Sequence, residues 1–84
     1  MSKSLGKQEW RELAHHVELD SGERYYLDSS WVYGVGFETV ACRVNGNGVI
    51  YPGSEQKKRH YDNYEDMVTD HYSLLDNLEG FVNE

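Results

Sequence analysis

The first side chains to consider for nucleophilic or acid–base chemistry in this 84-residue chain are four histidines and one cysteine, at His15, His16, His60, His71 and Cys42. A Cys–His catalytic pair needs a thiol that a substrate can reach. Cys42, however, alternates with apolar residues in a predicted strand, so we expect it to be a small buried core residue. The sequence also contains no Gly-x-Ser-x-Gly elbow, phosphate loop or His-Glu-x-x-His pair. We therefore predict no catalytic residues and a protein that is not an enzyme.

A metal site is the second kind of chemistry to consider, because Asp66, Asp70 and His71 lie one turn apart in a predicted helix. His15 and His16 add two imidazoles, but adjacent side chains in a helix point about 100° apart and cannot easily share one ion. Exposed helix faces also bring carboxylates to this spacing without binding a metal. A single cysteine excludes a disulfide within the chain and a zinc site made of cysteines alone. We predict neither a metal nor another cofactor.

Charge is distributed unevenly along the chain, and this is the most informative feature of the sequence. Residues 1–60 carry eight acidic and eight basic residues, whereas residues 61–84 carry seven acidic residues and no basic one. The C-terminal segment therefore holds the whole net charge of −7. Such a segment is either a solvated helix face that keeps the protein in solution or a surface that binds a basic partner.

The aromatic content favours the second interpretation. Aromatic residues make up 13 % of the chain, more than one small core needs, so several tyrosines are expected at the surface. Tyrosine and tryptophan are enriched at protein interfaces, and carboxylates steer a basic partner toward its site. Regularly spaced carboxylates on a helix can also imitate the phosphates of a nucleic acid. The predicted partner-binding residues are Glu65, Asp66, Asp70, Asp76, Tyr64 and Tyr72.

Direct binding of nucleic acid has one argument, the basic run Lys57-Lys58-Arg59-His60 with tyrosines nearby. The acidic segment that follows at once would repel the same phosphate backbone. The net charge is also opposite to the basic footprint of most nucleic-acid binders. We interpret the run as a solvated strand edge and predict no direct contact with nucleic acid.

The first two thirds of the chain are predicted to form a short helix followed by a sheet. A helix is expected over residues 7–16, because Trp10, Leu13 and Ala14 repeat at helical spacing. Strand-forming segments follow at 24–27, 30–34, 37–44, 49–51 and 57–61. The turn signal Asn45-Gly46-Asn47-Gly48 predicts that segment 37–44 pairs antiparallel with 49–51. The candidates for the inner face of segment 37–44 are Phe37, Val40, Cys42 and Val44.

A longer amphipathic helix is predicted at the C-terminus. Asp62 is its expected N-cap, because Glu65 follows three residues later as in a capping box. Gly80 is its expected stop, after which Phe81 and Val82 return to the sheet. Its apolar stripe is predicted to be Tyr64, Met67, Val68, His71, Tyr72, Leu75 and Leu78. The sequence thus predicts an α+β fold with a short N-terminal helix, a three- to four-stranded antiparallel sheet and a C-terminal acidic helix packed on one sheet face.

A chain of this length is expected to form a single domain over residues 1–84. It contains no run of about 20 apolar residues that could span a membrane, and its first residues lack the apolar core of a signal peptide. A single cysteine is compatible with a reducing compartment. We therefore expect a soluble protein of the cytoplasm of a host cell, without a membrane partner.

Short stretches of the sequence, taken in order, resemble small bacteriophage-encoded proteins of unknown activity. They are Ser30-Trp31-Val32-Tyr33-Gly34, Phe37-Glu38-Thr39-Val40 and Arg59-His60-Tyr61-Asp62-Asn63-Tyr64-Glu65, followed by His71. The resemblance covers about residues 29–75. This chain departs from the pattern because it lacks the usual long loop between Gly34 and Phe37, and because His60 separates Arg59 from Tyr61. The resemblance implies a mobile-element setting, and by analogy small acidic phage proteins often bind and block host enzymes, including CRISPR effectors.

These observations give one functional expectation and two alternatives. We expect a non-enzymatic phage-type protein that binds and inhibits a host protein with a basic surface, such as a nucleic-acid-handling defence complex, in the manner of an anti-CRISPR. The first alternative is a phage accessory or structural protein that forms a homodimer or larger homo-oligomer through a sheet edge. The second is a small-ligand-binding protein whose sheet-face pocket is formed by Tyr25, Trp31, Tyr33 and Arg43.

Overall fold

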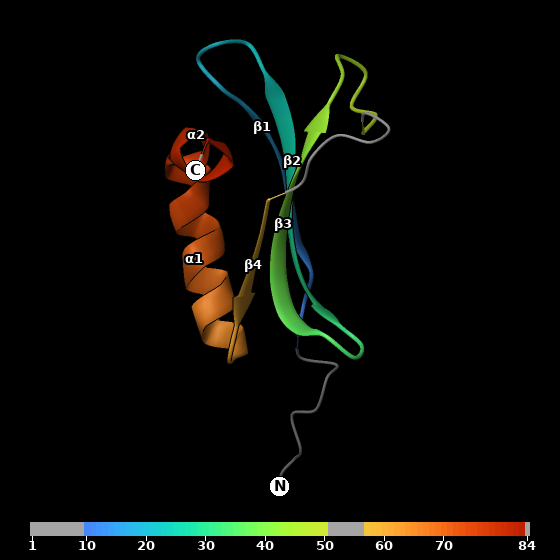
Figure 1. Ribbon diagram of the computed structural model, residues 1–84, viewed down its shortest axis with the longest axis vertical. Helices are drawn as coiled ribbons and strands as arrows, with labels where there is room; N and C mark the ends of the chain where they lie inside the picture. The colour runs from blue at the N-terminus through green and yellow to red at the C-terminus, as the bar shows by residue number, and fades with distance from the viewer. Residues whose placement is uncertain (1–9, 51–56, 84) are drawn as a thin grey trace, which may run out of the picture.

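The computed structural model describes residues 10–50 and 57–83 (Figure 1). Its elements are strands β1 (Leu13–Glu18), β2 (Arg24–Val32), β3 (Gly36–Val44) and β4 (Lys57–Tyr61), then helices α1 (Tyr64–Asp76) and α2 (Leu78–Val82). The strands form one antiparallel sheet in the order β1-β2-β3-β4, and α1 packs on one of its faces. The predicted α+β fold, with an antiparallel sheet and a C-terminal helix on it, is therefore confirmed.

The predicted helix at 7–16 is wrong for the residues that the structure describes; residues 7–9 lie outside them. Leu13–Glu18 forms strand β1, which pairs along its whole length with β2. Half-buried and exposed residues alternate along it, as in a strand with one covered face. A helix of about ten residues is marginal without packing. The ladder with β2 satisfies the same backbone groups and also brings Leu13, His15 and Val17 to the covered face.

The predicted strands at 24–27 and 30–34 merge into the single strand β2. Asp28 and Ser29 continue the ladder opposite Val40 and Thr39 of β3. The connection to β3 is a tight turn in which the Val35 amide donates to the Val32 carbonyl at 2.9 Å. Gly34 has a φ of 82° in this turn, a left-handed conformation that residues with a Cβ rarely adopt.

The predicted turn at Asn45–Gly48 is present, because the Asn45 amide donates to the Val49 carbonyl and the Gly48 amide donates to the Asn45 carbonyl. Beyond the turn, the expected pairing is reduced to an isolated bridge between Val44 and Ile50. Tyr51 lies outside the described residues. The partner that continues the sheet beside β3 is β4, the basic segment that the sequence predicted as a short last strand.

The sheet face that α1 covers differs from the prediction in β3. Leu27 of β2 and Ala41 of β3 are paired, and both belong to the core with Leu74, Leu78 and Phe81 from the helices. Alternation then places Phe37 and Thr39 on the same face, but Val40, Cys42 and Val44 on the opposite one. The prediction followed hydrophobicity, whereas the small side chain of Ala41 suits the position beneath the helix. Cys42 is nevertheless buried, with 6 % of its surface exposed, as expected.

Helix α1 begins and ends at other residues than predicted. Its N-cap is Asn63, whose Oδ1 accepts the Asp66 amide at 2.8 Å, and not Asp62. It ends at Asp76, so that Gly80 lies within α2 instead of stopping the helix. Phe81 is buried in the core, which confirms that the chain returns to the sheet after the helix. No helix in the described ranges is long and apolar enough to cross a membrane.

Candidate partner-binding surface

Helix α1 presents carboxylates to solvent on the side that faces away from the sheet. Glu65, Asp66 and Asp76 are exposed, and Tyr72 has 49 % of its surface exposed. Because successive helical residues differ by about 100°, Glu65, Tyr72 and Asp76 fall within about 40° of one another around the helix axis. We call Glu65, Asp66, Tyr72 and Asp76 the acidic face. Tyr72 was predicted in the apolar stripe, and its place among the buried residues is taken by Leu74.

Asp70 was predicted as a partner-binding residue, but in the structure its carboxylate contacts two residues of β4. Its Oδ2 lies 3.1 Å from Nη1 of Arg59 and also accepts a hydrogen bond from the Tyr61 hydroxyl. The Arg59 guanidinium lies over the ring of Phe81, 5.0 Å from its centroid. Asp70 therefore ties α1 to β4 and shares its charge with a base inside the molecule.

Tyr64 is also less available than the other predicted partner-binding residues. It is half-buried at the start of α1, with its ring centroid 6.3 Å from that of Phe37, and its hydroxyl accepts the Arg11 amide at 3.3 Å. Phe37 in turn contacts Trp10, which contacts Trp31. Of the six predicted residues, the structure thus places four on the exposed side of α1, whereas Asp70 and Tyr64 fasten the helix to the sheet.

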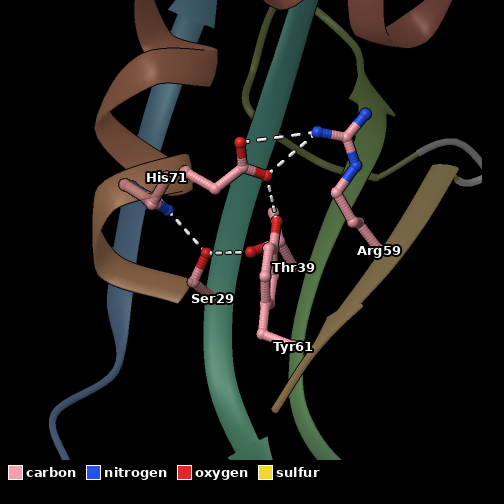
Figure 2. Close-up of polar contacts among 6 residues, drawn as sticks. Ser29, Thr39, Arg59, Tyr61 and His71 are labelled. Atoms are coloured by element: carbon pink, nitrogen blue, oxygen red, sulfur yellow. Dashed lines mark hydrogen bonds and ion pairs between the residues drawn. The ribbon is translucent and has the colours of Figure 1, made fainter. Parts of the chain in front are cut away.

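A buried polar network lies between α1 and the sheet, and sequence reasoning missed it (Figure 2). His71, Ser29 and Thr39 have no exposed surface. The Ser29 Oγ lies 2.7 Å from Nδ1 of His71 and 2.5 Å from Oγ1 of Thr39. On the other side of the imidazole, Nε2 of His71 lies 2.8 Å from Nδ1 of His15 in β1. Both ring nitrogens of His71 are therefore hydrogen-bonded, one to each of two strands.

Burial determines the protonation of this network. The pKa of His71 is lowered to about 4, first by burial and then by the nearby imidazole of His15. His71 is thus a neutral imidazole at neutral pH, with one donor and one acceptor for its two partners. The pKa of the Tyr61 hydroxyl is raised to about 12, first by burial and then by its hydrogen bond to Asp70, so this group remains a donor.

A weak sequence signal for the network existed. Ser29 and Thr39 are polar residues within or beside predicted strand segments, and the structure makes them cross-strand partners on the covered face. The predicted helix stripe contains a single histidine, His71, among apolar residues. A buried polar side chain needs a hydrogen-bond partner, so three such positions facing one interface could have been linked. The strand register, which the sequence did not provide, was needed to do so.

The opposite face of the sheet carries a second titratable group that was not predicted. Asp28 points away from α1, and one of its carboxylate oxygens is buried without a hydrogen-bond partner among the described residues. Its pKa is raised to about 7, first by burial, then by a hydrogen bond with Glu12 and by the charges of Glu12 and Glu38. Burial also raises the pKa of the Cys42 thiol on the same face, which keeps the thiol protonated and poorly nucleophilic.

The remaining predicted groups do not converge on one site. His15 and His16 lie on opposite faces of β1, and within the described ranges no three potential ligands are grouped to hold a metal ion. Two members of the basic run have acidic partners, because Arg59 pairs with Asp70 and Nε2 of His60 lies 3.1 Å from Oε1 of Glu38.

The four residues proposed for a small-ligand pocket share one sheet face only in part. Tyr25 and Arg43 are cross-strand partners, and Arg43 forms an ion pair with Glu23 at 3.1 Å. Tyr33 lies in the β2–β3 turn with 87 % of its surface exposed. Its ring contacts Trp31, with centroids 6.1 Å apart. Three surface hollows in the described structure are lined by other residues.

Comparison with known proteins adds no relative. The sequence matches no protein-family model, and no curated protein or solved structure is significantly similar to it.

The neutral state of His71 predicts a pH-dependent stability. Between about pH 6.5 and pH 4 the unfolded chain binds a proton at this residue and the folded chain does not, so acidification lowers the free energy of unfolding. The stability advantage of the wild type over the H71Q variant should therefore shrink by up to about 3 kcal/mol between pH 7 and pH 4. Urea unfolding followed by circular dichroism measures it. A difference that stays constant with pH would show that His71 titrates normally in the folded protein.

Asp28 predicts a pH dependence of the opposite sign. Its raised pKa means that the folded chain keeps this proton up to about pH 7, whereas the unfolded chain loses it near pH 4. Wild-type stability therefore falls over this range as the pH rises. The D28N variant, which stays neutral, should gain stability relative to the wild type from pH 4 to pH 7. Thermal melts of both proteins across that range test this, and a stability difference between D28N and the wild type that stays constant or shifts in favour of the wild type as the pH rises would contradict it.

Proposed function

We propose that this chain is a non-enzymatic, phage-type protein that binds a host protein with a basic surface and inhibits it. The proposed target is a nucleic-acid-handling defence complex in the host cytoplasm, which the chain would block in the manner of an anti-CRISPR. The observation that carries the proposal is the acidic face of α1. It combines exposed carboxylates with a half-exposed tyrosine, the pairing of charge and aromatic surface that suits contact with a basic protein.

The contacts of Asp70 support the proposal, because they distinguish this residue from the acidic residues of α1 that point to solvent. Among the described carboxylates of α1, Asp70 is the one paired with a cation, Arg59; it also accepts a hydrogen bond from the Tyr61 hydroxyl on the flank next to β4. Glu65 and Asp76 point outward instead. Since residues 61–84 contain no basic residue, the helix has no base of its own to offset these charges. A basic partner would supply the missing counter-charges, and such contacts steer association and fix orientation more than they add affinity.

The burial of the candidate nucleophiles supports a binding role over catalysis. Ser29 and Thr39 have no exposed surface, and both hydroxyls are engaged in the network with His71. The Cys42 thiol is buried with a raised pKa. A substrate would have to displace α1 to reach Ser29 or Thr39. A serine hydroxyl hydrogen-bonded to an imidazole resembles part of a catalytic site. Here the buried pair instead stabilises the fold.

A homodimer through β1 is the second candidate function, because β1 is the other edge strand of the described sheet. Its sequence, Leu13–Glu18, contains no lysine or proline, the residues that commonly protect an edge. In this case the acidic face would act in solubility alone. Sedimentation equilibrium separates the two candidates, since a monomer at high micromolar concentration would rule out this second function.

The test of the proposed function reverses charge on the acidic face in the E65K/D76K variant. The matched control is E18K/D20K, which makes the same change in net charge on exposed residues of the β1–β2 hairpin. Both tagged variants and the wild type are used to capture proteins from bacterial lysate, and each captured nucleic-acid-handling complex is assayed for cleavage of its target. We expect the E65K/D76K variant to bind the captured complex about tenfold more weakly or worse, and to lose inhibition with it.

Salt supplies an independent readout of the same test. Binding through exposed charges should weaken between about 50 and 300 mM salt, because the Debye length shortens over that range. The E18K/D20K control should keep both wild-type inhibition and this salt dependence. Equal inhibition by E65K/D76K and the wild type, or binding that is insensitive to salt, would refute the acidic face as the contact.

A further inference from the structure

A groove runs between β4 and α1. A hollow of about 520 Å³ is lined on one side by β4 and on the other by the flank of α1, with Arg59, His60, Tyr61, Asp66, Thr69, Asp70 and Ser73 around it. A second hollow, of about 230 Å³, shares Arg59, Asp70 and Ser73 with the first and continues along the helix to Phe81 of α2. We call the two together the β4–α1 groove. It follows the helix for much of its length, beside the strand that Figure 1 shows next to α1.

The wall of this groove that β4 forms is a strand edge. Among the described residues, β4 pairs with β3 on one side and with no strand on the other. The outward amides and carbonyls of an edge strand can pair with an added strand. The groove is also long enough for an added strand. The five residues of β4 and the segment from Asp66 to Asn77 each extend about 16 Å, which corresponds to roughly five residues of extended chain.

The wall that α1 forms selects the chemistry of the occupant. Asp70 is already neutralised by Arg59, whereas Asp66 is exposed and its carboxylate accepts a hydrogen bond from the uncharged side-chain amide of Asn63. Thr69 and Ser73, both exposed, add hydroxyl groups along the same wall. A lysine or arginine side chain from an added strand could reach Asp66. An acidic side chain at that position would be repelled.

We infer that the β4–α1 groove binds an extended segment of the partner protein, which adds to β4 as a fifth strand and places a lysine or arginine against Asp66. This inference rests on the proposed function, since it assumes a basic partner. A second copy of this chain is a poorer occupant. Full antiparallel pairing of β4 with its own copy would place Arg59 directly opposite the second Arg59, and like charges directly opposite destabilise a strand pair.

The probe for this site is a library of random ten-residue peptides displayed on filamentous phage and selected against the full chain. The enriched sequences should carry lysine or arginine and alternate in character, as residues of an added strand do. A synthetic peptide of the leading sequence should then slow hydrogen exchange at outward amides of β4 by about tenfold or more, because those amides become hydrogen-bonded. Failure to enrich any peptide, or enrichment of peptides without basic residues, would overturn the inference.

The T69K/S73K variant tests whether the selected peptide binds in the β4–α1 groove. It places two cations on the α1 wall at exposed residues and leaves the core unchanged. The control is S21K/N83K, which adds the same charge at exposed positions outside the groove. We expect the leading peptide to bind T69K/S73K about tenfold more weakly, and the control within twofold of the wild type. Unchanged binding to T69K/S73K would overturn the inference. So would a dimer of the free chain that T69K/S73K dissociates, because a second copy would then occupy the groove.

Failure of this inference can be told apart from failure of the proposed function. The groove is tested with peptides and the T69K/S73K variant, and the acidic face is tested with the host complex and the E65K/D76K variant. If the host complex responds to E65K/D76K but not to T69K/S73K, the proposed function stands and the groove is not part of the contact. If selected peptides respond to T69K/S73K while no host complex responds to E65K/D76K, the groove binds peptides and the acidic-face function falls.

Discussion

The hydrogen bonds of the buried His71 imidazole are the constraint on which the rest of this structure depends. In the described part of the chain, helix α1 covers one face of a four-stranded sheet, and this interface contains a buried polar network beside its apolar core. His71 meets Ser29 through one ring nitrogen and His15 through the other, and Ser29 continues to Thr39. A buried polar group without its partner costs about 1–3 kcal/mol, so a rotation or shift of α1 that broke these contacts would be penalised. The apolar contacts of Leu74 and Leu78 would allow several positions of the helix on the sheet. The hydrogen-bond network favours one of these positions.

The position of α1 on the sheet determines which of its side chains are exposed to solvent. With His71 directed at β2 and β1, Asp70 lies on the flank beside β4, where Arg59 neutralises it and the Tyr61 hydroxyl donates a hydrogen bond to it. Glu65, Tyr72 and Asp76 are consequently directed to solvent as one group. The groove next to β4 arises from the same geometry, because α1 follows β4 after a short connection and packs on the sheet face with one flank beside that strand. The acidic face and the groove are thus two consequences of one helix position, and the proposed contact with a basic partner uses both.

Much of the fold follows from the sequence, and the parts that do not have identifiable physical reasons. The amphipathic pattern of the C-terminal helix and the turn residues around Asn45 are local signals; the first predicted a helix that the structure contains, and the second predicted the turn but overstated the pairing beyond it, which is one isolated bridge. The segment at Leu13–Glu18 misled because its apolar spacing is short enough to fit either period, and only pairing with β2 decides in favour of a strand. The covered face of β3 was misassigned because Val40 and Cys42 are more apolar than Thr39 and Ala41. The exposure of Glu65 and Asp76 could be predicted from the helical period alone, whereas the ion pair of Asp70 with Arg59 depends on a strand that only the tertiary structure places beside α1.

The central claim is that a neutral, doubly hydrogen-bonded His71 fixes α1 on the sheet. Nuclear magnetic resonance of the uniformly ¹⁵N-labelled chain tests this most directly, through the chemical shifts of the two His71 ring nitrogens followed from pH 7.5 to pH 5. The account predicts one protonated and one unprotonated nitrogen, as in a single neutral tautomer, with shifts that do not change over this range. Shifts that average between the two tautomers, or that move to those of an imidazolium with a midpoint near pH 6.5, would contradict it.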